Sequence, residues 1–436
     1  MKKSAVFLTL FSLYHLAFTG GAHSLSLAEG LAIVTSEGRD VRIAETRAQA
    51  AEARLDLARS RRLPSVETFA DQTWLRYQPE ARFGGGSTSP IAEKESLRYG
   101  ISLHQLVTDF GRTGAGIMGA EARARSRDLS TRQTRNDSAI DFFVTYVDLL
   151  EAEHLLAVAD EEVRSFEAHL SDARALYEEG MVTVNDTLQA EVNLADALQR
   201  RISVRDDRAL KAARINYLLS RNLSDPVVPE EIVPSPLPDF TDADNAADIA
   251  LQTRLELEIL DLEIDFLESE REEARADHYP SVFVSGGYLF EENRYRVHED
   301  NWSLTAGVTW DLYSGGSKGA EVARAEAEVS GLRIQRERTA AAIQLEVKKA
   351  FLALTGSRDR EAVAKKAVRQ AEESLRLQRA RYEEGEGTAT EVTDAVTLLA
   401  RTEQNYWTAL YSVRRAEAAV LYATGTDLVE ALGKEN

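Results

Sequence analysis

The chain contains the same structural unit twice. The motif Tyr-Glu-Glu-Gly at residues 177–180 recurs at residues 382–385, a shift of 205 residues. Mostly apolar residues precede both copies at alternating intervals of three and four, starting at Val163 and at Val368. This spacing predicts long amphipathic helices of the coiled-coil type. A repeat of this length predicts one body built from two equivalent halves, where 436 residues would otherwise suggest separate domains.

Charge and cysteine content narrow the possible functions. Acidic residues outnumber basic ones by 72 to 52, which gives a formal charge of −20. A surface this negative argues against a nucleic-acid partner, because general nucleic-acid binders use positive charge to displace counterions. The chain contains no cysteine, so disulfides, thiolate metal sites and lipidation at an N-terminal cysteine are excluded. The histidines show no zinc-binding spacing, and we expect neither a metal nor another cofactor.

The first residues have the pattern of an export signal. Lys2 and Lys3 precede an apolar run over residues 5–18, and Ala22 and Ser24 are small residues at the two positions that a signal peptidase reads. We expect a signal peptide at residues 1–24, cleaved after Ser24. The alternative is a retained membrane anchor, but the run is short for a membrane span and ends in two glycines.

Two repeats and a linker account for the rest of the chain. Repeat 1 is predicted at residues 25–224, a proline-rich linker at 225–240, repeat 2 at 241–425 and a C-terminal tail at 426–436. The first helix is expected to begin at Ser26, with Glu29 three residues later, and its counterpart in repeat 2 near Thr241. Each repeat continues with two strands and a long helical hairpin. The strands are predicted at about 65–78, 96–107, 281–290 and 302–313, and the hairpins at 112–222 and 317–424.

The strands alternate between apolar and polar residues, yet no element is left over to cover their apolar faces. A sheet that faces lipid needs no such cover. Trp302 and Trp310 share one face of the last strand, eight residues apart, and this predicts an aromatic girdle that contacts outer-membrane lipid. Four strands are too few to close a membrane barrel, and an open sheet edge is not tolerated in lipid. Several chains are therefore expected to share one barrel.

Specific motifs accompany this architecture. Pro-Ser-Val follows the first helix of each half, at residues 64–66 and 280–282, and Asp-Phe-Gly ends the second strand at residues 109–111. Arg-Tyr-Glu-Glu-Gly at residues 381–385 is followed by Glu-Val-Thr-Asp-Ala at residues 391–395. With these motifs the chain resembles the TolC family of outer-membrane efflux proteins over essentially its whole mature length. The Asp-Phe-Gly ending is most similar to the branch that serves type I secretion.

The resemblance implies an α+β membrane protein that works as a homotrimer. Three chains would form a 12-stranded outer-membrane β-barrel, continued by a long α-helical coiled-coil tunnel in the periplasm. Such proteins are passive exit ducts of tripartite efflux or type I secretion systems. A periplasmic adaptor, also called a membrane fusion protein, recruits them to an inner-membrane pump, which is either an ABC exporter or proton-driven. We expect an outer-membrane location in a Gram-negative bacterium.

The resemblance also places candidate residues at the periplasmic end. The repeated motif marks the hairpin tips, where contact with the adaptor is expected at Tyr177, Gly180, Tyr382 and Gly385. For the glycines, the alternative is a turn that needs their backbone freedom.

Three carboxylates near the starts of the return helices are expected to ring the periplasmic aperture: Asp186, Glu391 and Asp394. The alternative is favourable placement of charge at a helix N-terminus. Related proteins can close this mouth with a basic residue after the tip glycine, but this chain has Gly387 and Thr388 there, which argues against such a latch.

Two further hypotheses remain open from the sequence. One is a soluble periplasmic coiled-coil scaffold or adaptor that carries a small sheet. The other is an exported enzyme, but the sequence offers no nucleophile–base pair and no metal constellation, and we expect no catalytic activity. The exported cargo leaves no recognisable trace in the sequence.

Overall fold

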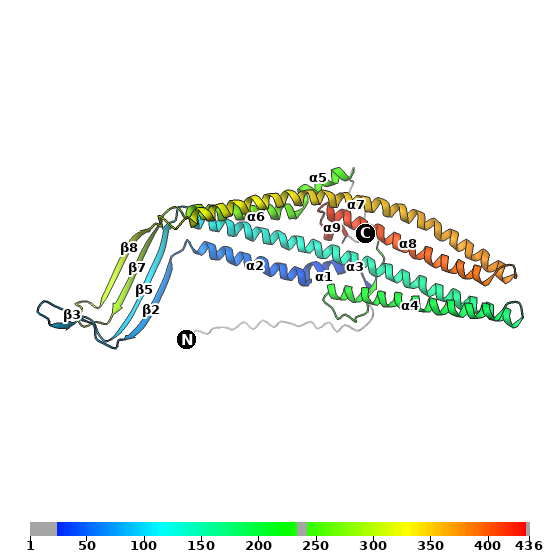
Figure 1. Ribbon diagram of the computed structural model, residues 1–436, viewed down its shortest axis with the longest axis horizontal. Coiled ribbons are helices and arrows are strands. Elements are labelled where there is room, and N and C mark those ends of the chain that lie inside the picture. The colour runs from blue at the N-terminus through cyan, green and yellow to red at the C-terminus, as the bar shows by residue number, and fades with distance from the viewer. Residues whose placement is uncertain (1–23, 233–241, 433–436) are drawn as a thin grey trace, which may run out of the picture.

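The computed structural model describes residues 24–232 and 242–432 of the chain. The described part is a long rod with a β-sheet at one end and helical hairpins along the rest (Figure 1). The sheet has four antiparallel strands in the order β2-β5-β7-β8. Their bounds are Ser65–Trp74 for β2, Glu95–Thr108 for β5, Ser281–Glu291 for β7 and Asp300–Thr309 for β8.

The register of the sheet separates an apolar face from a polar face. Ile101, Tyr288 and Trp302 are aligned across three neighbouring strands, and on the other face Ser102, Gly287 and Ser303 are aligned. Side chains alternate between the two faces of a strand, so period-two patterning produces this separation. Within the described residues, β2 and β8 each pair along one edge only. The sheet therefore has an apolar face, a polar face and two open edges.

The sheet departs in detail from the predicted strands. β2 ends at Trp74, four residues before the predicted end. β8 begins at Asp300 and ends at Thr309, so Trp310 follows the strand and does not belong to it. The predicted loop after β2 contains a small hairpin of β3 (Glu80–Arg82) and β4 (Thr88–Pro90), which extends the tip of the sheet (Figure 1).

The helices of the two halves match one another in length. The first pair, α1 (Leu27–Glu37) and α5 (Ala243–Thr253), has 11 residues each, and α2 (Arg39–Ser60) and α6 (Leu255–Ala276) have 22 each. The long helices α3 (Arg112–Glu178) and α7 (Ser317–Glu383) have 67 each. The return helices α4 (Val184–Leu218) and α8 (Ala389–Ala423) have 35 each.

The ends of the first helices follow local sequence signals. The Ser26 side chain accepts a hydrogen bond from the Glu29 backbone N–H, as expected, and Gly38 separates α1 from α2. In repeat 2 the cap is Asp242, which accepts from the Asn245 N–H, whereas the predicted start at Thr241 lies outside the described residues. A break at Arg254 between α5 and α6 was not predicted.

Glycines set both ends of the long helices. Gly111 and Gly316 have φ values of 106° and 86° and are the N-cap residues at which the connections from β5 and β8 enter α3 and α7. At the far ends, Gly180 and Gly385 have φ values of 77° and 73° and reverse the chain into α4 and α8. Only glycine adopts this left-handed region at no steric cost. Each long helix spans about 100 Å at about 1.5 Å per residue.

The largest buried cluster lies in the middle of the rod, where α3, α4 and α8 meet, and we call this region the waist. Its largest side chains, Phe142 and Tyr146, are fully buried. The C-terminal segment also joins this cluster, because α9 (Leu428–Leu432) buries Leu428 completely. The proline-rich linker contributes β6 (Val228–Pro229), which pairs in parallel with β1 (Ser24–Leu25). The predicted linker and tail are therefore partly packed against the helices.

Candidate functional site: the hairpin tips, the sheet face and the waist

The tips of the two helical hairpins lie next to each other at one end of the rod (Figure 1). A buried cluster joins them, with Val163 and Phe166 from α3 packed with Leu375 from α7 and Val392 from α8. The two turns share backbone features: the tip glycines have nearly the same φ, and the N–H after each glycine donates to the carbonyl five residues earlier, at 2.8 Å. The predicted tip residues are therefore brought together at one end of the molecule.

The two tyrosines of the repeated motif have different environments. Tyr177 is 47 % exposed, whereas Tyr382 is 4 % exposed and belongs to the cluster between the hairpins. The ring of Tyr382 packs against His169 of α3, with 5.2 Å between ring centroids. The predicted adaptor contact through the Tyr382 side chain does not agree with this burial. Its ring packs within the chain, whereas the ring of Tyr177 is half exposed at its tip.

Two of the three predicted aperture carboxylates form capping boxes. An Asp186 oxygen accepts a hydrogen bond from the Thr183 backbone N–H at 2.8 Å, and a Glu391 oxygen accepts from the Thr388 N–H at 2.8 Å. These bonds occur at the third helical position, where a carboxylate satisfies free N–H groups. The pKa of Glu391 is lowered, mainly because its carboxylate accepts the hydrogen bond from the Thr388 N–H. Both residues thus have the local role that the sequence left open as the alternative.

Asp394 differs from the other two carboxylates. Its side chain is exposed, one turn into α8, and it is not the capping residue of that helix. No basic side chain follows the tip glycine at Gly387 or Thr388, and Arg381, which precedes it, lies 3.8 Å from Glu391. Asp186 and Glu391 each cap a helix of their own chain, whereas Asp394 does not. Asp394 is therefore the strongest candidate for a role at the aperture.

The predicted girdle residues lie at the surface. Trp302 is 75 % exposed and Trp310 is 56 % exposed. The indole N–H of Trp310 donates to the backbone carbonyl of His278 at 3.0 Å, which fixes the ring beside the junction between sheet and helices. A tryptophan with an exposed apolar body and a bonded N–H suits a membrane interface.

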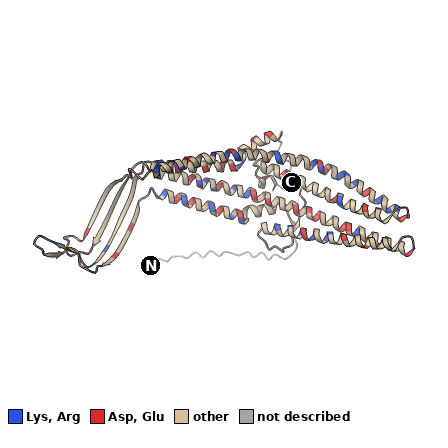
Figure 2. Cartoon of the chain, viewed as in Figure 1, with Lys and Arg blue, Asp and Glu red and all other residues tan. Residues whose placement is uncertain are grey.

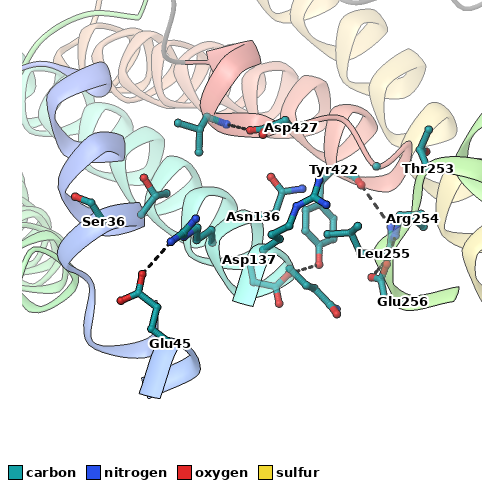
Figure 3. A pocket seen from close by; sticks show the side chains of 16 residues that line it. Ser36, Glu45, Asn136, Asp137, Thr253, Arg254, Leu255, Glu256, Tyr422 and Asp427 are labelled. Carbon is teal, nitrogen blue, oxygen red and sulfur yellow. Dashed lines mark hydrogen bonds and ion pairs between the residues drawn. The ribbon is translucent and has the colours of Figure 1, made fainter. Parts of the chain in front are cut away.

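A cavity of about 560 Å³ lies at the waist, where α2, α3, α6 and α8 come close. Figure 3 shows the Tyr422 hydroxyl pointing at Asp137, to which it donates at 2.6 Å. Arg254 contacts Glu256 at 2.6 Å and stacks over the Tyr422 ring. The pKa of Asp137 is raised, mainly because its carboxyl is buried. These groups satisfy one another and leave no cluster that points to a reaction.

The described residues offer no metal site and no membrane-spanning helix. Between residues 24–232 and 242–432, no group of three or more His, Asp or Glu side chains could hold a metal ion. No helix in the same ranges combines the length and the apolar character needed to cross a membrane.

Comparison with known proteins decides the family. The family described as outer membrane efflux protein matches residues 34–221 and 246–426. The chain belongs to the outer membrane efflux protein family. Its curated relatives include the outer membrane protein TolC of Salmonella enteritidis, at 23 % identity over 93 % of this chain and 84 % of that protein. The proteases secretion protein PrtF of Dickeya chrysanthemi is 21 % identical over 88 % of this chain and 84 % of its own length.

Solved structures share the fold. The outer-membrane channel OprN has a TM-score of 0.78 at 20 % identity, covering 92 % of this chain and 90 % of that one. The outer membrane protein VceC of Vibrio cholerae has a TM-score of 0.79 at 15 % identity, covering 92 % and 96 %. The family is one of channels and not of enzymes. The predicted family, the class of outer-membrane exit duct and the outer-membrane location are thereby confirmed.

Proposed function

We propose that three copies of this chain form one conduit across the outer membrane and the periplasm. The observation that carries the proposal is the sheet, which has an apolar face, a polar face and two open edges. Its four strands cannot close alone, whereas three copies supply twelve, within the known range of membrane barrels. The matched lengths of the two halves support an origin by duplication.

The helices give the conduit its length. α3 and α7 follow β5 and β8 through short connections that end in Gly111 and Gly316, so each barrel strand pair leads into a helix of about 100 Å. Packed around a threefold axis, such helices enclose a tunnel. The tips at Gly180 and Gly385 then lie at the end away from the membrane, where an adaptor protein and an inner-membrane pump would dock.

The relatives leave two kinds of cargo open. One is named for multidrug resistance, the protein MdtQ of Shigella flexneri, and another for secretion of proteases. A passive duct suits both kinds, because the pump and the adaptor select what enters. We propose that this chain is recruited by such a pump and adaptor, with Tyr177 as the exposed aromatic contact at the tip.

Fractionation and conductance test the proposal. We expect a heat-modifiable trimer in outer-membrane fractions that forms conducting pores in planar bilayers. Release of a monomer by osmotic shock would instead favour the soluble scaffold.

Arginine substitutions on the two faces of β8 test which face meets lipid. Leu304→Arg on the apolar face should destabilise the barrel by about 2–4 kcal/mol, because it places a charge in lipid. Thr305→Arg, its neighbour on the polar face, is the matched control and should be tolerated. Equal loss of stability in both variants would contradict a lipid-facing sheet.

A further inference from the structure

Charged residues of both signs occur along all the long helices (Figure 2). Many of the arginines have a carboxylate partner, such as Arg125 with Glu121 and Arg336 with Asp261. One group departs from this rule. Five arginines, from α2, its C-cap residue and α3, line a common groove of about 560 Å³: Arg47, Arg54, Arg61, Arg123 and Arg127.

Within the described residues, none of these five arginines forms an ion pair. Arg123 lies over the ring of Phe266, 4.3 Å from its centroid. Burial raises the pKa of the nearby Glu270 carboxyl, and Arg324 and Arg123 reduce that rise. Glu273 is the carboxylate that lines the groove, and it pairs with Arg112 at 3.8 Å. The groove is therefore strongly basic in a chain whose formal charge is −20. We call these five arginines the basic groove.

Helical periodicity segregates the charges on both helices. Arg47, Arg54 and the C-cap residue Arg61 are seven residues apart and share one side of α2 and its end. Glu45 and Glu52 each precede one of these arginines by two residues, which places them on the opposite side.

The same separation occurs on α3. Arg123 and Arg127 are four residues apart and share one side of the helix. Glu121 precedes Arg123 by two residues and pairs with Arg125 on the opposite side. The concentration of positive charge is thus a property of one face of both helices.

The polar face of the sheet locates the basic groove in the proposed conduit. A second hollow, at the junction of sheet and helices, is lined by Ser65, His104, Ser281 and Thr309. The register places these four on the face opposite Trp302 and Leu304. Arg61 and Glu273 line both this hollow and the basic groove. The basic groove therefore continues the polar face, which is the water side of the proposed barrel.

The dimensions of the groove indicate the kind of ligand. From Arg47 to Arg61 the helix rises about 21 Å, with a guanidinium group about every 10 Å. A compact anion would contact only one of these guanidinium groups at a time. An extended polypeptide of about six residues, at about 3.3 Å each, spans all three. Guanidinium groups pair well with carboxylates, whose geometry they match.

We propose that the basic groove binds extended acidic segments of a polypeptide cargo on their way through the conduit. This inference rests on the proposed function, because it requires that the groove faces the lumen. It assigns a substrate class that the comparisons leave open, namely an acidic polypeptide.

Blockade of single channels by decaglutamate tests the inference. The groove variant combines Arg47→Gln, Arg54→Gln and Arg61→Gln. The control variant combines Arg42→Gln, Arg59→Gln and Arg125→Gln, which removes the same charge from the opposite sides of the helices. At 0.1 M KCl we expect the groove variant to shorten the blockades about tenfold and the control to leave them within about twofold of the natural protein. At 1 M KCl the difference should vanish through screening.

Several outcomes would overturn the inference. Equal blockade times in the groove and control variants would show that the groove does not bind the peptide. Blockade by citrate that depends on the groove as strongly as blockade by decaglutamate would assign the site to small anions. A variant with Arg47→Lys, Arg54→Lys and Arg61→Lys keeps the charge of the groove. It should restore most of the blockade time if the glutamine substitutions weaken peptide binding and do not disturb folding.

Conductance without peptide separates the two proposals. If the natural protein forms pores that decaglutamate passes without groove-dependent blockade, only the basic groove is refuted. If it forms no pores, the conduit fails, and the inference fails with it.

Discussion

His169 on α3 and Tyr382 on α7 face each other between the two hairpin tips, with ring centroids 5.2 Å apart. Each is 4 % exposed, and neither the His169 Nε2 nor the Tyr382 hydroxyl has a hydrogen-bond partner among the described residues. The residues around them, such as Phe166 and Leu375, are apolar. Burying a polar atom without a partner costs stability. This pair is therefore a weak point in the packing that holds the two hairpins together.

The stability of the tips should fall in mild acid because of His169. Burial lowers its pKa below the ordinary 6.5, Arg379 lowers it further, and Asp172 raises it in part. The unfolded chain then binds more protons than the folded chain, so stability is complete above about pH 6.5 and is lost as pH falls through the folded pKa. Thermal unfolding between pH 5 and pH 8 should show a smaller pH dependence in His169→Phe than in the natural protein. Parallel curves for the two proteins would contradict this.

Tyr382 should tolerate loss of its hydroxyl but not of its ring. Tyr382→Phe removes a buried hydroxyl that has no partner, so its effect on the free energy of unfolding should be neutral or stabilising by up to about 1 kcal/mol. Tyr382→Ala should cost about 3–5 kcal/mol by leaving a cavity. The control is Tyr177→Ala at the equivalent position, which is half exposed and should change stability by less than about 0.5 kcal/mol. Similar losses for the two alanine variants would contradict the asymmetry of the tips.

Tyr146 should hold the linker against the waist. Its hydroxyl is fully buried, lies 2.7 Å from the Leu25 carbonyl and accepts a hydrogen bond from the Glu230 N–H at 2.8 Å. Tyr146→Phe removes the hydrogen bonds of this hydroxyl and leaves the Glu230 N–H with the Leu25 carbonyl, at 3.2 Å, as its remaining acceptor. It should therefore lower the free energy of unfolding by about 0.5–1.5 kcal/mol.

Limited proteolysis gives a second measurement of this contact. Cleavage within β6 and the residues that follow should be faster in Tyr146→Phe. The control is Tyr411→Phe, because the Tyr411 hydroxyl meets the Glu231 carboxylate at a longer 3.3 Å and that carboxylate is largely exposed. Unchanged proteolysis in Tyr146→Phe would rule out the proposed restraint.

Local features of this fold were predictable from the sequence. The long helices follow from uninterrupted apolar periodicity between two glycines, and the cap at Ser26 follows from a serine with a glutamate three residues on. The separation of the sheet faces follows from alternation with a period of two. In each case the signal lies within one segment of the chain, so no knowledge of distant contacts is needed.

Features that depend on distant contacts were not predictable. Tyr177 and Tyr382 occur in identical four-residue motifs, and Tyr382 is buried because it packs against His169 and in the cluster between the hairpins. β6 lies in a proline-rich linker and forms because β1 is beside it. The basic groove brings together two helices, although the seven-residue spacing of Arg47, Arg54 and Arg61 was visible in the sequence and could have suggested a charged face.

Asp394 should contribute more to ion selectivity than Glu391, because Glu391 already caps its own helix. If the carboxylates ring the aperture in a trimer, Asp394→Asn should shift the reversal potential in a KCl gradient toward zero, since a ring of like charges attracts cations. The control is Asp128→Asn, which removes the same charge from the far part of α3 and should leave the potential unchanged. Thr388→Ala should instead cost about 1 kcal/mol of stability through the lost cap, without a change in selectivity. An unaltered reversal potential in both Asp394→Asn and the double variant with Glu391→Gln would refute a selective carboxylate ring.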